Sequence, residues 1–310
     1  MKQKFLRLRI VVLLHLLAVS SVVVAESPGD GSGEFKKFLM KRQSSLSTIE
    51  ALRMKGTLKI TSGIADNAPE VTQYNFQIWA KRGRIKEILE ALDNTGKAKQ
   101  TEIYYLTTKQ VAVVEGGSFR EGKVFTLGRA ENTGLFSECP AFLEYAFLHI
   151  SIGDYGTPAF RPSDIASPDK WQRVVQSLRA VNKKKDGTLR AVLSNNDKTT
   201  TVDLAAPSGV NRGYQIRLIT FFRDNEKTID RKIEVLSYNN DRSFGNIGKE
   251  FKMSIFSGKK REIPDVTWEY KITDYQLNTP IKDELLKFDP ASVDRIYDGD
   301  REVFITAPKR

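Results

Sequence analysis

The chain has 310 residues, a hydrophobic fraction of 40% and a formal net charge of +11 at pH 7. Its single cysteine, Cys139, cannot form an internal disulfide, so the fold must be stabilised by a hydrophobic core. The basic residues form short clusters beside turn residues, without the interleaved aromatic residues or zinc-ligand spacing of nucleic-acid binders. These features exclude a disulfide scaffold and predict no nucleic acid among the partners.

Residues 1–25 have the pattern of a cleavable signal peptide. Four basic residues and no acidic one precede an apolar run over residues 10–24, and Ala25 ends a small-residue cleavage pattern. The run is shorter than the roughly 20 residues that cross a hydrocarbon core, so a retained membrane anchor is the weaker interpretation. Removing this segment leaves +7 of the +11 charges. We expect a periplasmic or secreted protein whose mature form begins at Glu26.

A flexible leader and an amphipathic helix are predicted next. Residues 26–33 are rich in glycine and serine and have nothing to bury. From Glu34 the period changes to that of a helix with one buried stripe. The residues of this stripe recur at three- and four-residue steps: Phe35, Phe38, Leu39, Arg42, Leu46 and Ile49.

Alternation of apolar and polar residues then predicts a series of strands. The pattern is clear in residues 52–60 and 74–80, where every second side chain is apolar. Further strand-like runs lie at residues 85–91, 102–106, 110–115, 189–193, 199–204, 214–222, 232–238, 251–256 and 266–277. The connections between neighbouring runs are mostly short and contain turn formers, which predicts antiparallel neighbours in a meander.

The middle of the chain predicts two helices. The first spans residues 137–150, starts at Ser137 and is apolar nearly all round. The second starts near Ser167, with Trp171, Val174, Val175 and Leu178 on one side. The fold class is therefore α+β, an antiparallel sheet with helices segregated to one side. A two-domain split near residue 160 is the alternative.

The residues that carry common enzyme chemistry are scarce. The mature chain has one histidine, His149, and it lies inside the apolar helix. A catalytic triad would have no other histidine as its base, and one histidine with one cysteine cannot complete the four ligands of a zinc site. The acidic pairs Asp283–Glu284 and Asp298–Asp300 lie at expected helix starts or turns, where carboxylates cap backbone amides. The sequence predicts no enzyme, no metal and no cofactor.

The C-terminal end carries a recognisable string. Residues 272–281 read ITDYQLNTPI, residues 286–290 read LKFDP and residues 293–296 read VDRI. This resembles the closing segment of the LolA-like periplasmic lipoprotein carriers, with Leu286 in place of the usual first Phe. The string IWAKRGR at residues 78–84 resembles the family's basic turn, with Gly83 where proline is more usual.

The resemblance implies a strongly curved antiparallel half-barrel of about eleven strands, with helices on the concave side and an apolar cavity. Residues 34–310 would form a single domain with an enlarged middle region, residues 119–262. The implied ligands are lipid or lipoprotein acyl chains, and a membrane-bound protein is a further implied partner. We expect a monomer.

The candidate ligand-binding residues follow from the resemblance and from the apolar pattern. The cavity residues are Phe76, Ile78, Arg84 and Trp268, and the lid residues are Phe142, Tyr145, Phe147 and Leu148. Two other functions stay open. One is an envelope sensor or regulatory protein that binds a partner through an edge strand. The other is a hydrolase that uses His149 or an acidic pair.

Overall fold

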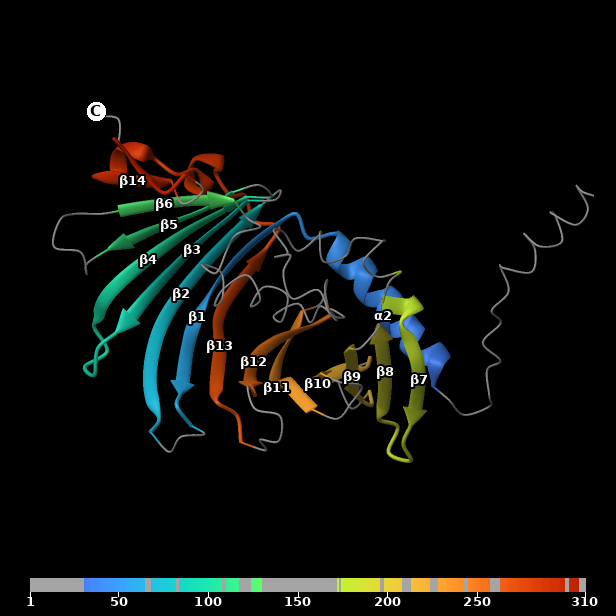
Figure 1. The fold of residues 1–310 in the computed structure, drawn as a ribbon. Coiled ribbons are helices and arrows are strands. Elements are labelled where there is room, and N and C mark those ends of the chain that lie inside the picture. Colours follow the sequence, from blue (N-terminus) through green and yellow to red (C-terminus); the bar gives the residue numbers. More distant parts are fainter. Residues whose placement is uncertain are drawn as a thin grey trace, which may run out of the picture.

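A computed structural model of the chain describes most of the region that the strand patterns cover. The described residues are 31–64, 68–81, 84–107, 110–116, 124–129, 172, 174–195, 198–207, 213–223, 228–241, 245–256, 263–298 and 301–306. Within these ranges the chain forms one sheet of fifteen strands, which curves strongly (Figure 1). The predicted signal peptide and the predicted helix at residues 137–150 lie outside the described residues.

The elements, in chain order, begin with one α-helix. Their bounds are α2 Ser32–Ser47, β1 Ala51–Ser62, β2 Glu70–Lys81, β3 Arg84–Leu92, β4 Ala98–Thr107, β5 Gln110–Gly116, β6 Val124–Arg129, β7 Leu178–Lys183, β8 Leu189–Asn195, β9 Lys198–Ala205, β10 Gln215–Arg223, β11 Thr228–Asp241, β12 Gly245–Ile255, β13 Val266–Leu277, the short 3-10 turns η3 Asp283–Leu286 and η4 Pro290–Ser292, β14 Arg295–Asp298 and β15 Val303–Thr306.

The sheet consists of two meanders joined at its centre. Strands β1 to β6 follow one another outward on one side, and β7 to β13 run from the far edge inward until β13 pairs with β1. Every pair is antiparallel except β14 with β6, which is parallel. Residues before and after position 160 therefore contribute strands to the same sheet.

One face of the sheet, which we call the core face, is apolar. On β1 it carries Met54 and Leu58, and the strand register places Ile78 of β2 and Tyr270 of β13 beside them. Helix α2 packs on this face, where Phe35 and Leu39 join the same buried cluster as the side chains of β7 and β8. Figure 1 shows α2 running along that end of the sheet.

The opposite face, which we call the polar face, is exposed to solvent and carries cross-strand ion pairs. Cross-strand ion pairs join Lys55 to Asp274 at 3.8 Å, Lys59 to Glu269 at 3.5 Å and Lys271 to Glu250 at 3.2 Å. All six side chains are between 33% and 58% exposed, so each pair is worth less than about 1 kcal/mol.

The C-terminal segment crosses the polar face after β13. Its Ile281 and Leu286 are buried against Trp79 of β2 and Ile88 of β3. Further along, the Phe288 ring meets Tyr105 of β4, with ring centroids 5.7 Å apart. The chain then reaches β14 beside β6, so the string that resembles the carrier family is the segment that spans β1 to β6.

Asn278 fixes the point where this crossing begins. Its backbone has a positive φ of 55°, a conformation that asparagine tolerates better than most residues. Its side-chain Oδ1 accepts from the backbone N–H of Glu50 at 2.8 Å and of Ala51 at 3.3 Å, and its Nδ2 donates to the Thr48 carbonyl at 2.8 Å. The residue thus ties the end of β13 to the link between α2 and β1.

The predicted secondary structure is largely confirmed. All eleven predicted strand runs are strands, as β1 to β5 and β8 to β13, and they pair as the predicted meander. The helix α2 begins at Ser32, two residues before the predicted start and inside the predicted leader. The described residues add β6, β7, β14 and β15, so the sheet has more strands than the implied eleven or so.

The assignment of Leu178 to a helix is wrong. Residues 174–176 are helical, but Leu178 is the first residue of β7 and lies opposite Leu193 of β8. The helical spacing of the predicted stripe extends to Leu178, but Leu178 pairs with β8 as a strand residue. Pairing with β8 gives hydrogen-bond partners to backbone groups that would have none at the end of a helix.

Candidate functional site

The structure brings three of the predicted cavity residues onto the core face. Phe76 and Ile78 of β2 and Trp268 of β13 are all buried and belong to one cluster. That cluster runs without a break from β4, through the centre of the sheet, to β7 at its edge. This makes the core face the widest apolar surface among the described residues.

The alternation predicted around Trp268 is confirmed. Trp268 and Tyr270 are buried, with ring centroids 6.3 Å apart, whereas Lys271 is exposed and Glu269 is half-buried. The indole therefore points into the core face, as the period of the strand requires.

Arg84 does not join the cavity residues. It is exposed at the start of β3, and its neighbour Ile85 is buried on the core face, so Arg84 lies on the polar face. The four lid residues, Phe142, Tyr145, Phe147 and Leu148, and also Cys139 and His149, lie outside the described residues.

Two polar residues at the core face are buried. Arg42 of α2 is buried, and loss of solvent lowers the pKa of its guanidinium to about 10. Burial also raises the pKa of the nearby Tyr238 of β11, which Arg42 partly offsets, and the Tyr238 hydroxyl donates to the Ile216 carbonyl. The helical spacing had placed Arg42 in the buried stripe.

Glu87 is the second of these residues and was not among the predicted site residues. This residue of β3 is buried on the core face, between Ile78 of β2 and Tyr104 of β4 in the strand register. Its burial could have been predicted from its position in the strand. Residues 85, 87 and 89 lie on the same side of β3, and Ile85 and Leu89 are both buried.

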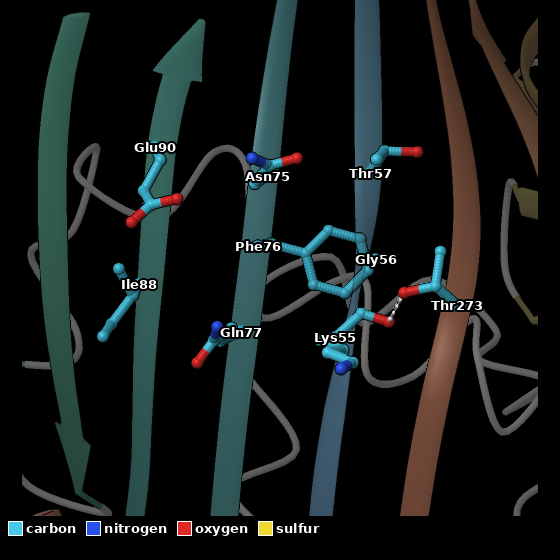
Figure 2. A pocket seen from close by; sticks show the side chains of 9 residues that line it. All are labelled: Lys55, Gly56, Thr57, Asn75, Phe76, Gln77, Ile88, Glu90 and Thr273. Carbon is cyan, nitrogen blue, oxygen red and sulfur yellow. Dashed lines mark hydrogen bonds between the residues drawn. The ribbon is translucent and has the colours of Figure 1, made fainter. Parts of the chain in front are cut away.

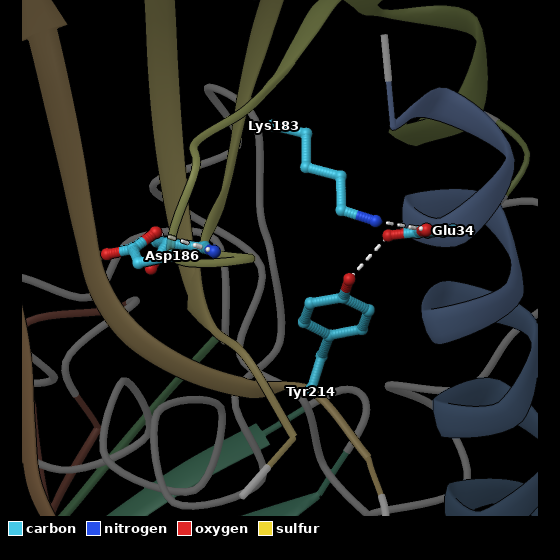
Figure 3. A network of polar contacts seen from close by, with 5 residues as sticks. Glu34, Lys183, Asp186 and Tyr214 are labelled. Carbon is cyan, nitrogen blue, oxygen red and sulfur yellow. Dashed lines mark hydrogen bonds and ion pairs between the residues drawn. The ribbon is translucent and has the colours of Figure 1, made fainter. Parts of the chain in front are cut away.

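A polar network fastens the start of α2 to the sheet (Figure 3). The Lys183 ammonium of β7 donates to Glu34 Oε1 at 2.6 Å, and the Tyr214 hydroxyl donates to Glu34 Oε2. These hydrogen bonds, that from Lys183 first, lower the pKa of Glu34. Burial, followed by the contact with Glu34, raises the pKa of Tyr214 to about 12. The network joins three segments that are far apart in sequence.

This network should make part of the stability of the protein depend on pH. Because the pKa of Glu34 is lowered in the folded state, its contribution is present above the unfolded value of about 4.3 and is lost as pH falls through the folded value. Glu34→Gln should therefore cost about 0.5 kcal/mol at pH 7, since solvent screens the pair, and nothing near pH 2. Urea unfolding of both proteins at the two pH values measures this. An equal cost at both would contradict it.

The described residues also form a pocket on the polar face, which we call the outer groove (Figure 2). Its volume is about 320 Å³, near the lower end of the range for ligand sites. The side chains of β1, β2 and β3 that line it lie on the polar face by the strand register, and Gly56 and Phe76, which lie between them along β1 and β2, complete the lining. The lining residues are Lys55, Gly56, Thr57, Asn75, Phe76, Gln77, Ile88, Glu90 and Thr273.

Gly56 shapes this groove. Between β1 and β13 the register shifts at Lys55 and Gly56, so that Thr273 bulges out of the pairing. A Cβ at Gly56 would lie 2.1 Å from the Lys271 carbonyl oxygen and 2.6 Å from the Phe76 ring. Only glycine fits under that ring. The bulge cannot be seen in the sequence, because the pattern of one strand does not show how its partner pairs with it.

Two observations limit the chemistry of the described residues. No group of three or more histidine, cysteine, aspartate or glutamate side chains that could hold a metal occurs among them. Likewise, no helix in the described ranges is long and apolar enough to cross a membrane.

Comparisons with known proteins give matches among solved structures. No family model matches the chain, and no curated protein sequence does. The chain is similar to a DUF1329 family protein from Desulfovibrio piger, at 7% identity and a TM-score of 0.46, over 83% of this chain and 98% of that one.

Two further solved structures resemble the chain. One is a LolA superfamily protein from Nitrosomonas europaea, at 9% identity and a TM-score of 0.42, over 82% of this chain and 97% of that one. The other is a putative outer membrane lipoprotein-sorting protein domain from Vibrio parahaemolyticus, at 10% identity and a TM-score of 0.44, over 81% and 95%.

Proposed function

We propose that the chain is an exported carrier or binding protein for an apolar ligand, an acyl chain or a lipoprotein that bears one. The observation that supports this most is the core face, an apolar surface that continues from β4 to β7 on one curved sheet. The resemblance of the C-terminal string to the LolA-like carriers supports the same function. Binding would be non-covalent burial of the ligand.

An apolar surface of this width has to be covered. Soluble proteins rarely leave contiguous apolar patches larger than a few hundred Å² in contact with water. Among the described residues, α2 packs on the core face at β7 and β8. The part of the core face around Phe76, Ile78 and Trp268 must therefore be covered by something else. In this proposal the core face is the concave side of a half-barrel, and a ligand shares that cover with the rest of the chain.

The lid is part of the proposal. Phe142, Tyr145, Phe147 and Leu148 would spread over most of the circumference of one helix, so they cannot all face a flat sheet. A lid with one side on the core and another on an acyl chain accommodates them. Arg84, which lies on the polar face, is outside the cavity in this proposal and is free to meet a headgroup or a protein partner.

The remaining features of the proposal concern organisation and location. Residues 1–25 would be removed on export, and residues 34–310 would act as a single domain and as a monomer. Exchange of ligand with a membrane-bound partner would complete the transport cycle. No step of it needs a metal, a cofactor or a catalytic residue.

Native mass spectrometry of the purified protein tests the proposal. We expect a population whose excess mass is lost on extraction with organic solvent and matches an acyl lipid or a lipidated peptide. Loading of the emptied protein with palmitate-containing micelles should restore the adduct. A protein that is free of lipid as purified, and that takes up none, would contradict the carrier function.

A further inference from the structure

The outer groove lies between two rows of side chains that cross the strands. Strand pairing places Lys55, Gln77 and Ile88 in one row, and Thr57, Asn75 and Glu90 in the next. Rows two residues apart along a strand are separated by roughly 7 Å. The backbone at Gly56 forms the floor between them, so the groove runs across the sheet.

Three polar side chains of this groove have no hydrogen-bond partner among the described residues. Elsewhere on the polar face, charged side chains pair across the strands, as Lys59 does with Glu269. In contrast, the side chains of Thr57, Asn75 and Gln77 make no hydrogen bond to any described residue, and each faces the groove. Three neighbouring polar groups thus point at one space with their donors and acceptors available.

The chemistry of the lining selects a neutral ligand with many hydroxyl groups. Two amides offer donors and acceptors together and Glu90 offers acceptors. The Lys55 ammonium, which lies 3.8 Å from Asp274, has further donors, so one charge of each sign faces the space. A hydroxyl group donates and accepts at once and can pair with each of these. An extended peptide that adds to a sheet needs an open edge, whereas this groove lies over β1, β2 and β3 in the interior of the sheet.

We propose that the outer groove binds a short, neutral saccharide chain, held by Asn75 and Gln77 with Glu90. The site lies on the face opposite the proposed acyl-chain cavity and does not depend on it. Its ligand would lie across the strands, with a sugar ring between the two rows of side chains.

Saturation-transfer difference NMR on the purified protein tests this with chitotriose, cellotriose and trialanine as probes. We expect saturable signals from at least one saccharide, with a Kd of about 1 mM, and none from trialanine. The double variant Asn75→Ala, Gln77→Ala should weaken binding at least tenfold. Gln73→Ala, on the same strand and face but outside the groove, should leave the Kd unchanged, and circular dichroism checks that both variants fold.

Three results would overturn the proposal. These are no saturable saccharide signal up to about 20 mM, a range that covers weak binding, an unchanged Kd in the double variant, or binding of trialanine alone. The last result would assign the groove to peptides.

Discussion

Gly56→Ala is expected to lower the free energy of unfolding by about 3 kcal/mol, the upper range for overpacking a buried site. The added methyl group would lie 2.1 Å from the Lys271 carbonyl oxygen, which belongs to the backbone of β13 and cannot rotate away. It would also displace the Phe76 ring, which is buried. The two central strands of the sheet would have to separate or lose the bulge.

Urea unfolding measures this cost, with the midpoint and the slope fitted separately. Lys55→Ala is the matched control, because it alters the adjacent residue of β1 but removes only an exposed ion pair, worth less than about 1 kcal/mol. Equal stability of Gly56→Ala and the wild type would show that the strands do not meet in this register.

Asn278→Ala is expected to cost about 2 kcal/mol. Alanine loses the side-chain hydrogen bonds to Thr48, Glu50 and Ala51, each worth about 0.5–1.5 kcal/mol, and it adopts a positive φ less readily than asparagine. Asn278→Gly separates the two effects, because glycine keeps the backbone conformation and loses only the hydrogen bonds.

Thermal unfolding of the three proteins should therefore rank the wild type first, the glycine variant second and the alanine variant last. An alanine variant that is more stable than the glycine variant would show that the backbone at this position is not left-handed in solution.

The strands were predictable because their periods are local. Apolar residues recur at every second position of β13 from Val266 to Ile272, and of β1 from Leu52 to Ile60 apart from Gly56. The structure buries Leu58 and Trp268 accordingly. The two shortest strands, β14 and β15, have four residues each, too few for a period to emerge. The parallel pairing of β14 with β6 depends on the C-terminal segment crossing the polar face, which no local pattern encodes.

The candidate site was predictable only in part, for the same reason. Phe76 and Ile78 have the parity of a buried face, and this was sufficient to place them on it. The sequence pattern of Asn75 and Gln77 indicates only a solvent-exposed face of a strand. The groove that they line depends on a register shift between two other strands, β1 and β13. Glu34 and Lys183 are 149 residues apart, so their contact follows from topology alone.

An acyl chain that lies against the core face should quench the tryptophan there, and this quenching is the most direct test of the carrier function. The chain has three tryptophans, and Trp268 lies on the core face whereas Trp79 packs under the C-terminal segment on the polar face. A protein with Trp79→Phe and Trp171→Phe keeps only Trp268, and a protein with Trp171→Phe and Trp268→Phe keeps only Trp79.

Each protein is titrated with a bromine-labelled fatty acid, whose bromine quenches indole fluorescence at short range. The carrier function predicts saturable quenching of Trp268 and little or none of Trp79. Equal quenching of both, or quenching of Trp79 alone, would place the acyl chain away from the core face and contradict the proposed function.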